Sequence, residues 1–329
     1  MKEISIQDIQ GFAIGQAEDR EAGTGLTVVL CKEGAMGGLD VRGGGPASRE
    51  GTLLDPFVSP KAIHGVVLAG GSAFGLDAAG GAMKYLEERG YGFDVGVTKV
   101  PLVCQSDLFD LTVGDAFRRP DAAMAYEACL ASENGGNYRD GCFGAGTGAS
   151  VGKYKGMGFA MKSGIGSFAA EIGDFRMGAI AVVNAIGDVY DPHTGVKLAG
   201  LRGEGGKGFE SAEDLLLSHY DVVGNRFRGR NTTLGIVLTN GRFNPSQLQR
   251  IARMAHDGYA RCIRPVHTSA DGDSIYALSS GTVEADVDVA GTLAAKVIGE
   301  AICRAVLAAD GMYGLPAAKD MEYFRKDND

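Results

Sequence analysis

The sequence predicts an α/β or mixed α+β protein in which helices pack on the faces of a sheet. Four short apolar runs bounded by Gly or Asn predict strands at residues 25–31, 65–69, 179–184 and 234–239. Segments with apolar residues at helical spacing lie between and after these runs, which favours helices that cover a sheet. Glycine accounts for 52 of the 329 residues, so we expect many tight turns and close backbone contacts.

Three segments carry the pattern of an amphipathic helix. Residues 72–89 have apolar side chains at helical spacing and stop at Gly90, a typical helix end. Asn244 followed by Pro245 is typical of a helix start, and apolar residues then fall on one face as far as Tyr259. Residues 289–309 contain a wide apolar stripe. We therefore expect helices in these three places.

Residues 202–230 differ from the rest of the chain. They carry six glycines and many charges, interrupted only by a short amphipathic piece at 213–217, which predicts an exposed loop or linker. Asn231, Thr232 and Thr233 follow, and then an apolar strand begins. A loop that ends at a threonine before a buried strand fits a self-cleavage junction, and it equally fits an ordinary surface loop.

Charge and hydropathy exclude two classes of partner. The net charge is −9, the acidic residues are scattered, and no basic patch with interleaved aromatics is present, so we expect no nucleic-acid binding. The apolar runs are far shorter than the roughly 20 residues that span a bilayer, so we expect no membrane partner. The first ten residues alternate charged and apolar side chains and lack the pattern of a signal peptide, which favours the cytoplasm.

The usual cofactor and metal motifs are incomplete. Residues 144–149 fit the G-x-G-x-x-A fingerprint, but no convincing strand precedes them and no acidic residue in a βαβ setting follows about 20 residues later. The six cysteines form no CxxC pair, and the five histidines form no HxH or HExxH pattern. Cys142 lies in a glycine-rich stretch but has no His or acid at a suggestive spacing. We therefore expect no cofactor and no metal ion.

Asp271 and Asp273 flank Gly272. In an extended turn two such carboxylates point to the same side, where they can orient a hydroxyl or an amine while one raises the pKa of the other. The plainer interpretation is an Asp-Gly turn without a chemical role.

Several blocks of the sequence together are specific to one family. They are DVRGGGP at 40–46, RE at 49–50, LDP at 54–56, VLAGGSAFGLD at 67–77, GAGTG at 144–148, VNA at 183–185, NTTL at 231–234 and DGD at 271–273. With these blocks the chain resembles the L-aminopeptidase/D-esterase (DmpA-like) family of self-processing N-terminal-nucleophile hydrolases, which includes β-peptidyl aminopeptidases and nylon-oligomer endo-hydrolases. The resemblance covers nearly the whole chain.

The resemblance implies that the precursor is cut before a Ser or Thr. Here the matching bond joins Asn231 to Thr232, which would divide a single catalytic unit, 1–329, into chains 1–231 and 232–329. The freed α-amine of Thr232 would act as base and its hydroxyl as nucleophile. This division of roles is sensible because an α-amine, with a pKa of about 7.7–8.0, is partly neutral at working pH.

The resemblance also assigns the remaining site residues. Asp271 and Asp273 match an acidic pair that would orient the Thr232 amine and hydroxyl. Asn184 matches an asparagine that donates to the oxyanion. Lys155 matches a lysine beside the nucleophile, with Lys153 and Lys162 as alternatives close in sequence. A tyrosine used by some members aligns with Phe109 here, which argues against a tyrosine contact to the oxyanion.

The implied fold is a layered α/β/β/α-like sandwich of the type shared with ornithine acetyltransferase. The implied assembly is a homo-oligomer, a tetramer of processed heterodimers. The leading function is an aminopeptidase acting on a small peptide or amide substrate, and an endo-hydrolase of 6-aminohexanoate oligomers is the alternative. Two alternatives belong to other functional classes: an enzyme that transfers acyl groups in the manner of ornithine acetyltransferase, and a binding protein that is never processed.

Overall fold

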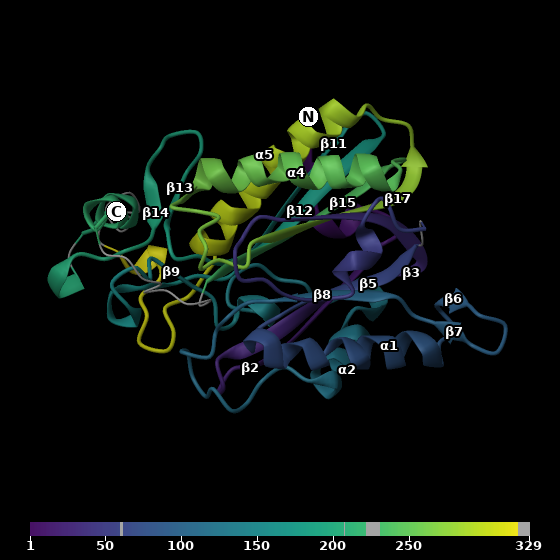
Figure 1. The fold of residues 1–329 in the computed structure, drawn as a ribbon, viewed down its shortest axis with the longest axis horizontal. Helices are drawn as coiled ribbons and strands as arrows, with labels where there is room; N and C mark the ends of the chain where they lie inside the picture. Colours follow the sequence, from purple (N-terminus) through teal and green to yellow (C-terminus); the bar gives the residue numbers. More distant parts are fainter. Residues whose placement is uncertain (60–61, 207, 222–230, 322–329) are drawn as a thin grey trace.

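The protein is built from two sheet layers packed face to face between two layers of helices (Figure 1). The computed structural model describes residues 1–59, 62–206, 208–221 and 231–321. Its long strand β3 (Thr24–Val41) belongs to both sheet layers, because its first half pairs with β2 and β5 and its second half pairs with β17. The layered α/β/β/α arrangement expected from the resemblance is therefore confirmed.

The first sheet layer runs in the order β1, β11, β12, β15, β17 and β3. The second continues from β3 to β5, β8 and β4, with β2 on the other side of β3. Their bounds are β1 (Lys2–Ile4), β2 (Ala13–Asp19), β4 (Ala47–Arg49), β5 (Ile63–Ala69), β8 (Val103–Asp107), β11 (Ile165–Ile172), β12 (Phe175–Asn184), β15 (Thr232–Gly241) and β17 (Ser274–Val283). Short strands lie outside these layers: β6 (Phe93–Asp94), β7 (Lys99–Val100), β9 (Ser150–Val151), β10 (Met161–Lys162), β13 (Asp188–Tyr190), β14 (Lys197–Ala199) and β16 (Ile263–Arg264).

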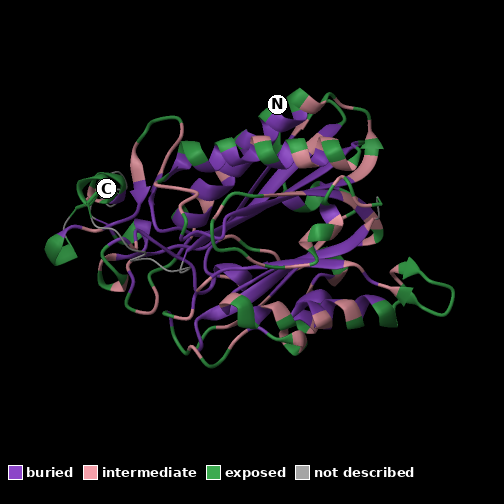
Figure 2. Cartoon of the chain, in the orientation of Figure 1, coloured by how far each residue is buried: buried purple, intermediate pink, exposed green. Residues whose placement is uncertain are grey.

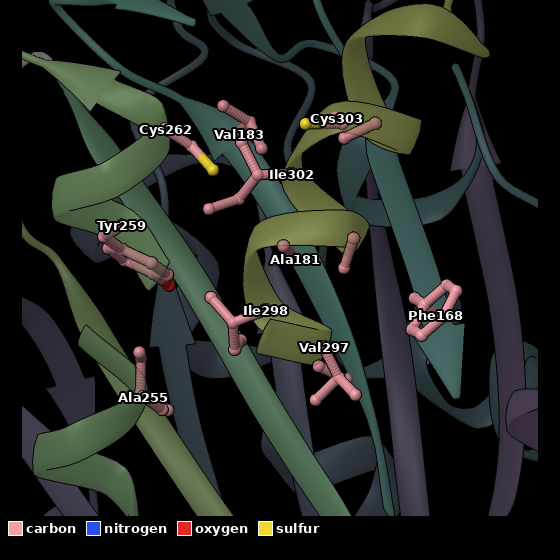
Figure 3. Packing of buried hydrophobic residues seen from close by; sticks show 14 of the residues in the cluster. Phe168, Ala181, Val183, Ala255, Tyr259, Cys262, Val297, Ile298, Ile302 and Cys303 are labelled. Carbon is pink, nitrogen blue, oxygen red and sulfur yellow. The ribbon is translucent and has the colours of Figure 1, made fainter. Parts of the chain in front are cut away.

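Each sheet layer is covered by a pair of helices. Helices α4 (Pro245–Cys262) and α5 (Val287–Leu307) pack on the first layer, and α1 (Ala79–Glu88) and α2 (Ala122–Ala131) pack on the second. Figure 3 shows part of this packing, with Ile298 and Ile302 of α5 close to Ala181 and Val183 of β12 and with α4 side chains such as Tyr259 beside them. The strands are buried while the outer helix faces are exposed (Figure 2). Among the residues described, no helix is both long and apolar enough to cross a membrane.

The predicted elements are present, with differences at their ends. The segment expected as one helix over 72–89 is a 3-10 helix (Ser72–Asp77) followed by α1. The chain is tight there, because a Cβ on Gly75 would lie 2.1 Å from the carbonyl oxygen of Gly70. The predicted loop at 202–230 contains helix α3 (Ala212–Ser218), capped by the Ser211 side chain. Residues 222–230 of that prediction lie outside the described residues.

Strand β15 determines where the site forms. It lies between β12, which runs antiparallel to it, and β17, which runs parallel. In this register Asn184, the last residue of β12, pairs with Thr232, the first residue of β15. Leu234 pairs with Ser274, the first residue of β17. The residues just before β17 are therefore brought to the same edge as Thr232 and Asn184.

Candidate active site

The hydroxyl of Thr232 contacts the peptide bond that precedes it. Its side chain is buried, and its hydroxyl donates a hydrogen bond to the carbonyl oxygen of Asn231. The same carbonyl oxygen accepts a hydrogen bond from the backbone N–H of Gly272, with a nitrogen-to-oxygen distance of 3.0 Å. The Asn231 carbonyl oxygen thus accepts hydrogen bonds from two donors, and such donors stabilise the negative charge that develops on a carbonyl oxygen during acyl transfer.

The Asp-Gly-Asp loop is held close to Thr232 by a glycine-rich segment that follows β3. Gly45 donates its N–H to the carbonyl oxygen of Asp271 at 2.8 Å. Only glycine permits this approach at position 43, because a Cβ there would lie 2.2 Å from the same oxygen. The GGG block of the sequence therefore serves to pack two backbones together beside the site.

Asp271 is a buried carboxyl group with a perturbed titration. One of its oxygens, Oδ2, accepts hydrogen bonds from the N–H and the hydroxyl of Thr268 at 2.7 and 2.6 Å. Burial, followed by the charge of Asp273, raises the pKa of Asp271 to about 6. A carboxyl group with such a pKa can exchange a proton near neutral pH.

Asp273 fixes the backbone next to Thr232. Its Oδ1 atom accepts the N–H of Thr233 at 2.7 Å, and its Oδ2 atom lies 2.8 Å from Nδ1 of His267. Its side chain is almost completely buried. Both members of the predicted acidic pair are therefore next to Thr232, and each has its own hydrogen-bond partners.

Asn184 and a lysine lie on the other side of Thr232. The side-chain carbonyl of Asn184 accepts hydrogen bonds from Nζ of Lys153 at 2.9 Å and from the N–H of Ser150 at 3.1 Å. Its amide nitrogen donates to the backbone carbonyl of Phe109 at 2.9 Å. The position where a tyrosine was considered therefore contributes its backbone to the orientation of Asn184.

Of the three candidate lysines, the structure places Lys153 against Asn184, whereas Lys155, the residue that the resemblance favoured, lies elsewhere. The ammonium of Lys155 pairs with Glu210 at 2.5 Å on the protein surface. Lys162 is buried elsewhere, with Nζ donating to the carbonyl oxygens of Gly146, Ala149 and Ser163. Burial lowers the pKa of Lys153 to about 7, against the opposing charges of Asp271, Asp110 and Asp273. Residues 153 and 155 are separated by a turn, so spacing in the sequence did not distinguish them.

Two further residues at the site were missed by the sequence analysis. Gly272 was treated only as a spacer between two carboxylates, although its N–H contacts the Asn231 carbonyl. His267 was grouped with the other histidines because no motif surrounds it. Its nearness to the DGD block was the one signal available.

Comparison with known proteins assigns the family. A sequence model of peptidase family S58 matches residues 5–319. An uncharacterized aminopeptidase of Mycobacterium tuberculosis (strain ATCC 25618 / H37Rv) is 39% identical over 346 residues, which covers 96% of this chain and 97% of that protein. A 6-aminohexanoate-oligomer endohydrolase of Kocuria sp. (strain KY2) is 27% identical over 311 residues, covering 91% of this chain and 84% of that protein.

Solved structures show the same fold. The PH0078 protein from Pyrococcus horikoshii OT3 superposes with a TM-score of 0.70 at 20% identity, covering 97% of this chain and 92% of that one. The L-aminopeptidase D-Ala-esterase/amidase from Ochrobactrum anthropi, described as a variant of the Ntn hydrolase fold, gives a TM-score of 0.66 at 19% identity, covering 93% and 86%. With the family match over almost the whole chain, these likenesses identify a hydrolase of peptide or amide bonds, and the chain belongs to peptidase family S58.

Proposed function

We propose that this chain is a self-cleaving amide hydrolase whose nucleophile is an N-terminal threonine, Thr232, and that it acts as an aminopeptidase on peptides or short amides. The observation that carries the proposal is the hydrogen bond from the Thr232 hydroxyl to the carbonyl oxygen of Asn231. The family supports the reaction class, since relatives over the full length of the chain are aminopeptidases by name.

Self-cleavage begins with an N-to-O acyl shift. The Thr232 oxygen bonds to the carbonyl carbon of Asn231, the C–N bond breaks, and the hydroxyl proton passes to the departing nitrogen. The Gly272 N–H stabilises the negative charge that develops on the carbonyl oxygen. Water then hydrolyses the ester, which leaves a carboxylate on Asn231 and a free α-amine and hydroxyl on Thr232.

The same groups serve the mature enzyme. The α-amine takes the proton of the Thr232 hydroxyl as it attacks the substrate carbonyl, and it returns that proton to the leaving amine. Asp271 and Asp273 hold this new terminus, with Asp273 already bonded to the N–H of Thr233. Lys153 and the second N–H of the Asn184 amide place positive charge and a donor near the oxyanion. Water releases the acyl group.

Hydrolysis of 6-aminohexanoate oligomers is the second candidate. It is favoured by relatives of that name and by the Asp-x-Asp pair, which matches the nylon-oligomer hydrolases. A panel of amino-acyl p-nitroanilides and 6-aminohexanoate oligomers separates the two activities. Hydroxylamine added to the same reactions reveals acyl transfer, because a hydroxamate then forms at the expense of the acid.

The experiment that tests the proposal compares three variants for chain cleavage and amide hydrolysis. Thr232→Ala removes the nucleophile, so we expect a folded, intact and inactive chain, while Thr232→Ser keeps an oxygen and cleaves more slowly. The matched control is Thr233→Val, because the Thr233 hydroxyl is buried without a hydrogen-bond partner among the described residues and an isosteric methyl should be tolerated. Thr233→Val should therefore cleave normally.

In the wild-type protein the two chains are expected in denaturing gels. Scaling 34.2 kDa by 231/329 and 98/329 gives about 24 and about 10 kDa. Amino-terminal sequencing of the smaller chain should read Thr-Thr-Leu-Gly. Fragments in Thr232→Ala, or an active preparation that contains only the intact chain, would overturn the mechanism. We propose a tetramer of the cleaved heterodimer as the assembly, which light scattering of the native protein tests.

A further inference from the structure

His267 is hydrogen-bonded to Asp273, the carboxylate that accepts the N–H of Thr233 next to the proposed nucleophile. Both its backbone N–H and its ring Nδ1 reach Oδ2 of Asp273, at 3.2 and 2.8 Å. This double contact depends on a left-handed backbone at His267, with φ of 58°. Since a carboxylate only accepts hydrogen bonds, Nδ1 is the donor.

Helix α4 fixes the His267 ring from the opposite side. The ring stacks on Tyr259, with centroids 5.8 Å apart and 27° between the planes. It also packs edge-on with the buried His256 ring, with centroids 4.8 Å apart and 73° between the planes. The Tyr259 hydroxyl donates to the carbonyl oxygens of Thr233 and Ser274, at 3.2 and 3.3 Å. The two backbone groups of Thr233 are therefore held by Asp273 and Tyr259, and His267 touches both of these side chains.

The second nitrogen of the His267 ring, Nε2, has no polar contact among the described residues. This atom is buried and has no hydrogen-bond partner there. Within the described part of the chain, Asp273 is therefore the one hydrogen-bond partner of the His267 ring.

We propose that His267 is a positioning residue for the threonine nucleophile. It acts through Asp273 on the peptide unit that joins Thr232 to Thr233, and so the inference rests on the proposed function. This peptide unit becomes the first one of the new chain after cleavage, when the covalent tie to Asn231 is gone. A fixed Asp273 then limits the movement of the terminal amine and hydroxyl, on which the geometry of attack depends.

Substitutions at one position test the proposal. In His267→Asn the amide nitrogen takes the place of Nδ1 and can donate to Asp273, whereas His267→Gly removes the donor. Both residues tolerate the left-handed backbone, so the pair differs in the donor while the chain conformation is kept. His267→Asp adds a third comparison, because ionised aspartate has the shape of asparagine but cannot donate and also repels Asp273.

The readouts are the rate at which the fragments appear and, for cleaved protein, kcat and KM on the amino-acyl p-nitroanilide that the wild type hydrolyses fastest. We expect His267→Gly to lower the cleavage rate and kcat on the order of 10²-fold with KM within about twofold, as for a misplaced reacting group. In His267→Asn the cleavage rate and kcat should both lie within about threefold of the wild-type values. If His267→Gly does not fold, His267→Asp replaces it as the variant without a donor, and its two rates are compared with those of His267→Asn.

Equal losses in His267→Asn and His267→Gly would overturn the proposal, because the donor would then be irrelevant. A loss confined to KM, or wild-type rates in His267→Gly, would overturn it as well. Failure of the proposed function looks different, since fragments would then form in Thr232→Ala. If Thr232→Ala stays intact while His267→Gly cleaves normally, only the role of His267 is wrong.

Discussion

Gly272→Ala places a single methyl group against the hydroxyl of Thr232, the proposed nucleophile. A Cβ at position 272 would lie 2.8 Å from the hydroxyl oxygen of Thr232, 3.0 Å from the carbonyl oxygen of Gly45 and 3.3 Å from Cα of Pro46. Gly272 does not have the left-handed backbone that opposes a side chain, so the lack of space is the whole effect. The softest of the three neighbours is the hydroxyl, because rotation about χ1 of Thr232 moves it away.

This rotation of the Thr232 side chain determines how far the cleavage rate should fall. An unstrained carbon-to-oxygen contact requires the hydroxyl to move by several tenths of an ångström, or into another rotamer, away from the Asn231 carbonyl. Misplacing a reacting atom by about 1 Å costs on the order of 10²-fold in rate. A hundredfold slower cleavage corresponds to about 2.7 kcal/mol in the barrier. Crowding against the backbone of Gly45 should also cost roughly 1–3 kcal/mol of folding stability.

The assay follows the conversion of the intact chain into fragments on denaturing gels, alongside thermal unfolding of the same samples. Gly158→Ala is the matched control, because a Cβ there meets nothing within 4 Å and the backbone is not left-handed. It should cleave at the wild-type rate. Wild-type cleavage in Gly272→Ala would refute the placement of the Thr232 hydroxyl, and an equally slow Gly158→Ala would show that the effect is not specific to the site.

Three more predictions concern the charged groups of the site. Asp271→Asn and Asp273→Asn should each slow amide hydrolysis by on the order of 10²–10⁴-fold in folded protein, and wild-type turnover in both would reduce the pair to a turn. Lys153→Met should slow hydrolysis by at least about tenfold. Lys155→Met loses only the surface ion pair with Glu210 and should retain wild-type turnover. Slow hydrolysis in Lys155→Met with wild-type turnover in Lys153→Met would place Lys155 at the site instead. If Asp271 orients the Thr232 hydroxyl in its ionised form, precursor cleavage should fall about tenfold for each pH unit below about 6, where the Asp271 carboxylate becomes protonated. Because the pKa of Asp271 is raised in the folded chain, its protonation favours folding as the pH falls below about 6, whereas burial lowers the pKa of His256 to about 3 and makes folding less favourable over the same range. Melting temperatures recorded at each pH therefore separate a loss of cleavage from a loss of fold, and cleavage that stays at its neutral rate in folded protein below about pH 5 would contradict the role of Asp271.

The sequence predicted the buried strands better than the groups that surround the nucleophile. Runs such as 179–184 and 234–239 lie within β12 and β15, because strands buried on both faces are apolar without alternation. Helix α2 was not predicted, although Asp121 caps it by accepting the N–H of Met124 at 2.9 Å, a signal that the sequence contains. The resemblance placed Asn184, Asp271 and Asp273, and the structure brings all three to Thr232.

The choice between Lys153 and Lys155 needed the fold. The chain turns at Gly152, whose φ is 69° and where a Cβ would lie 2.1 Å from the backbone of Gly200. After this turn Lys153 lies against Asn184, and Lys155, two residues later, pairs with Glu210. No local pattern encodes an approach between residues so far apart in sequence. His267 was missed for the same reason, since its role depends on contacts with α4.

The position of β15 explains how a cut chain can keep its active site. Under the proposed cleavage, fragment 232–329 contributes β15 and β17 to the first sheet layer, where they lie between β12 and β3 of fragment 1–231. Both outer sides of this strand pair are hydrogen-bonded to the other fragment, with Thr232 itself opposite Asn184. The new terminus is thus the first residue of a strand that is paired on both sides. Cleavage then gives Thr232 an amine without releasing the backbone that aims its hydroxyl, so one side chain can serve both self-cleavage and the hydrolysis of substrate.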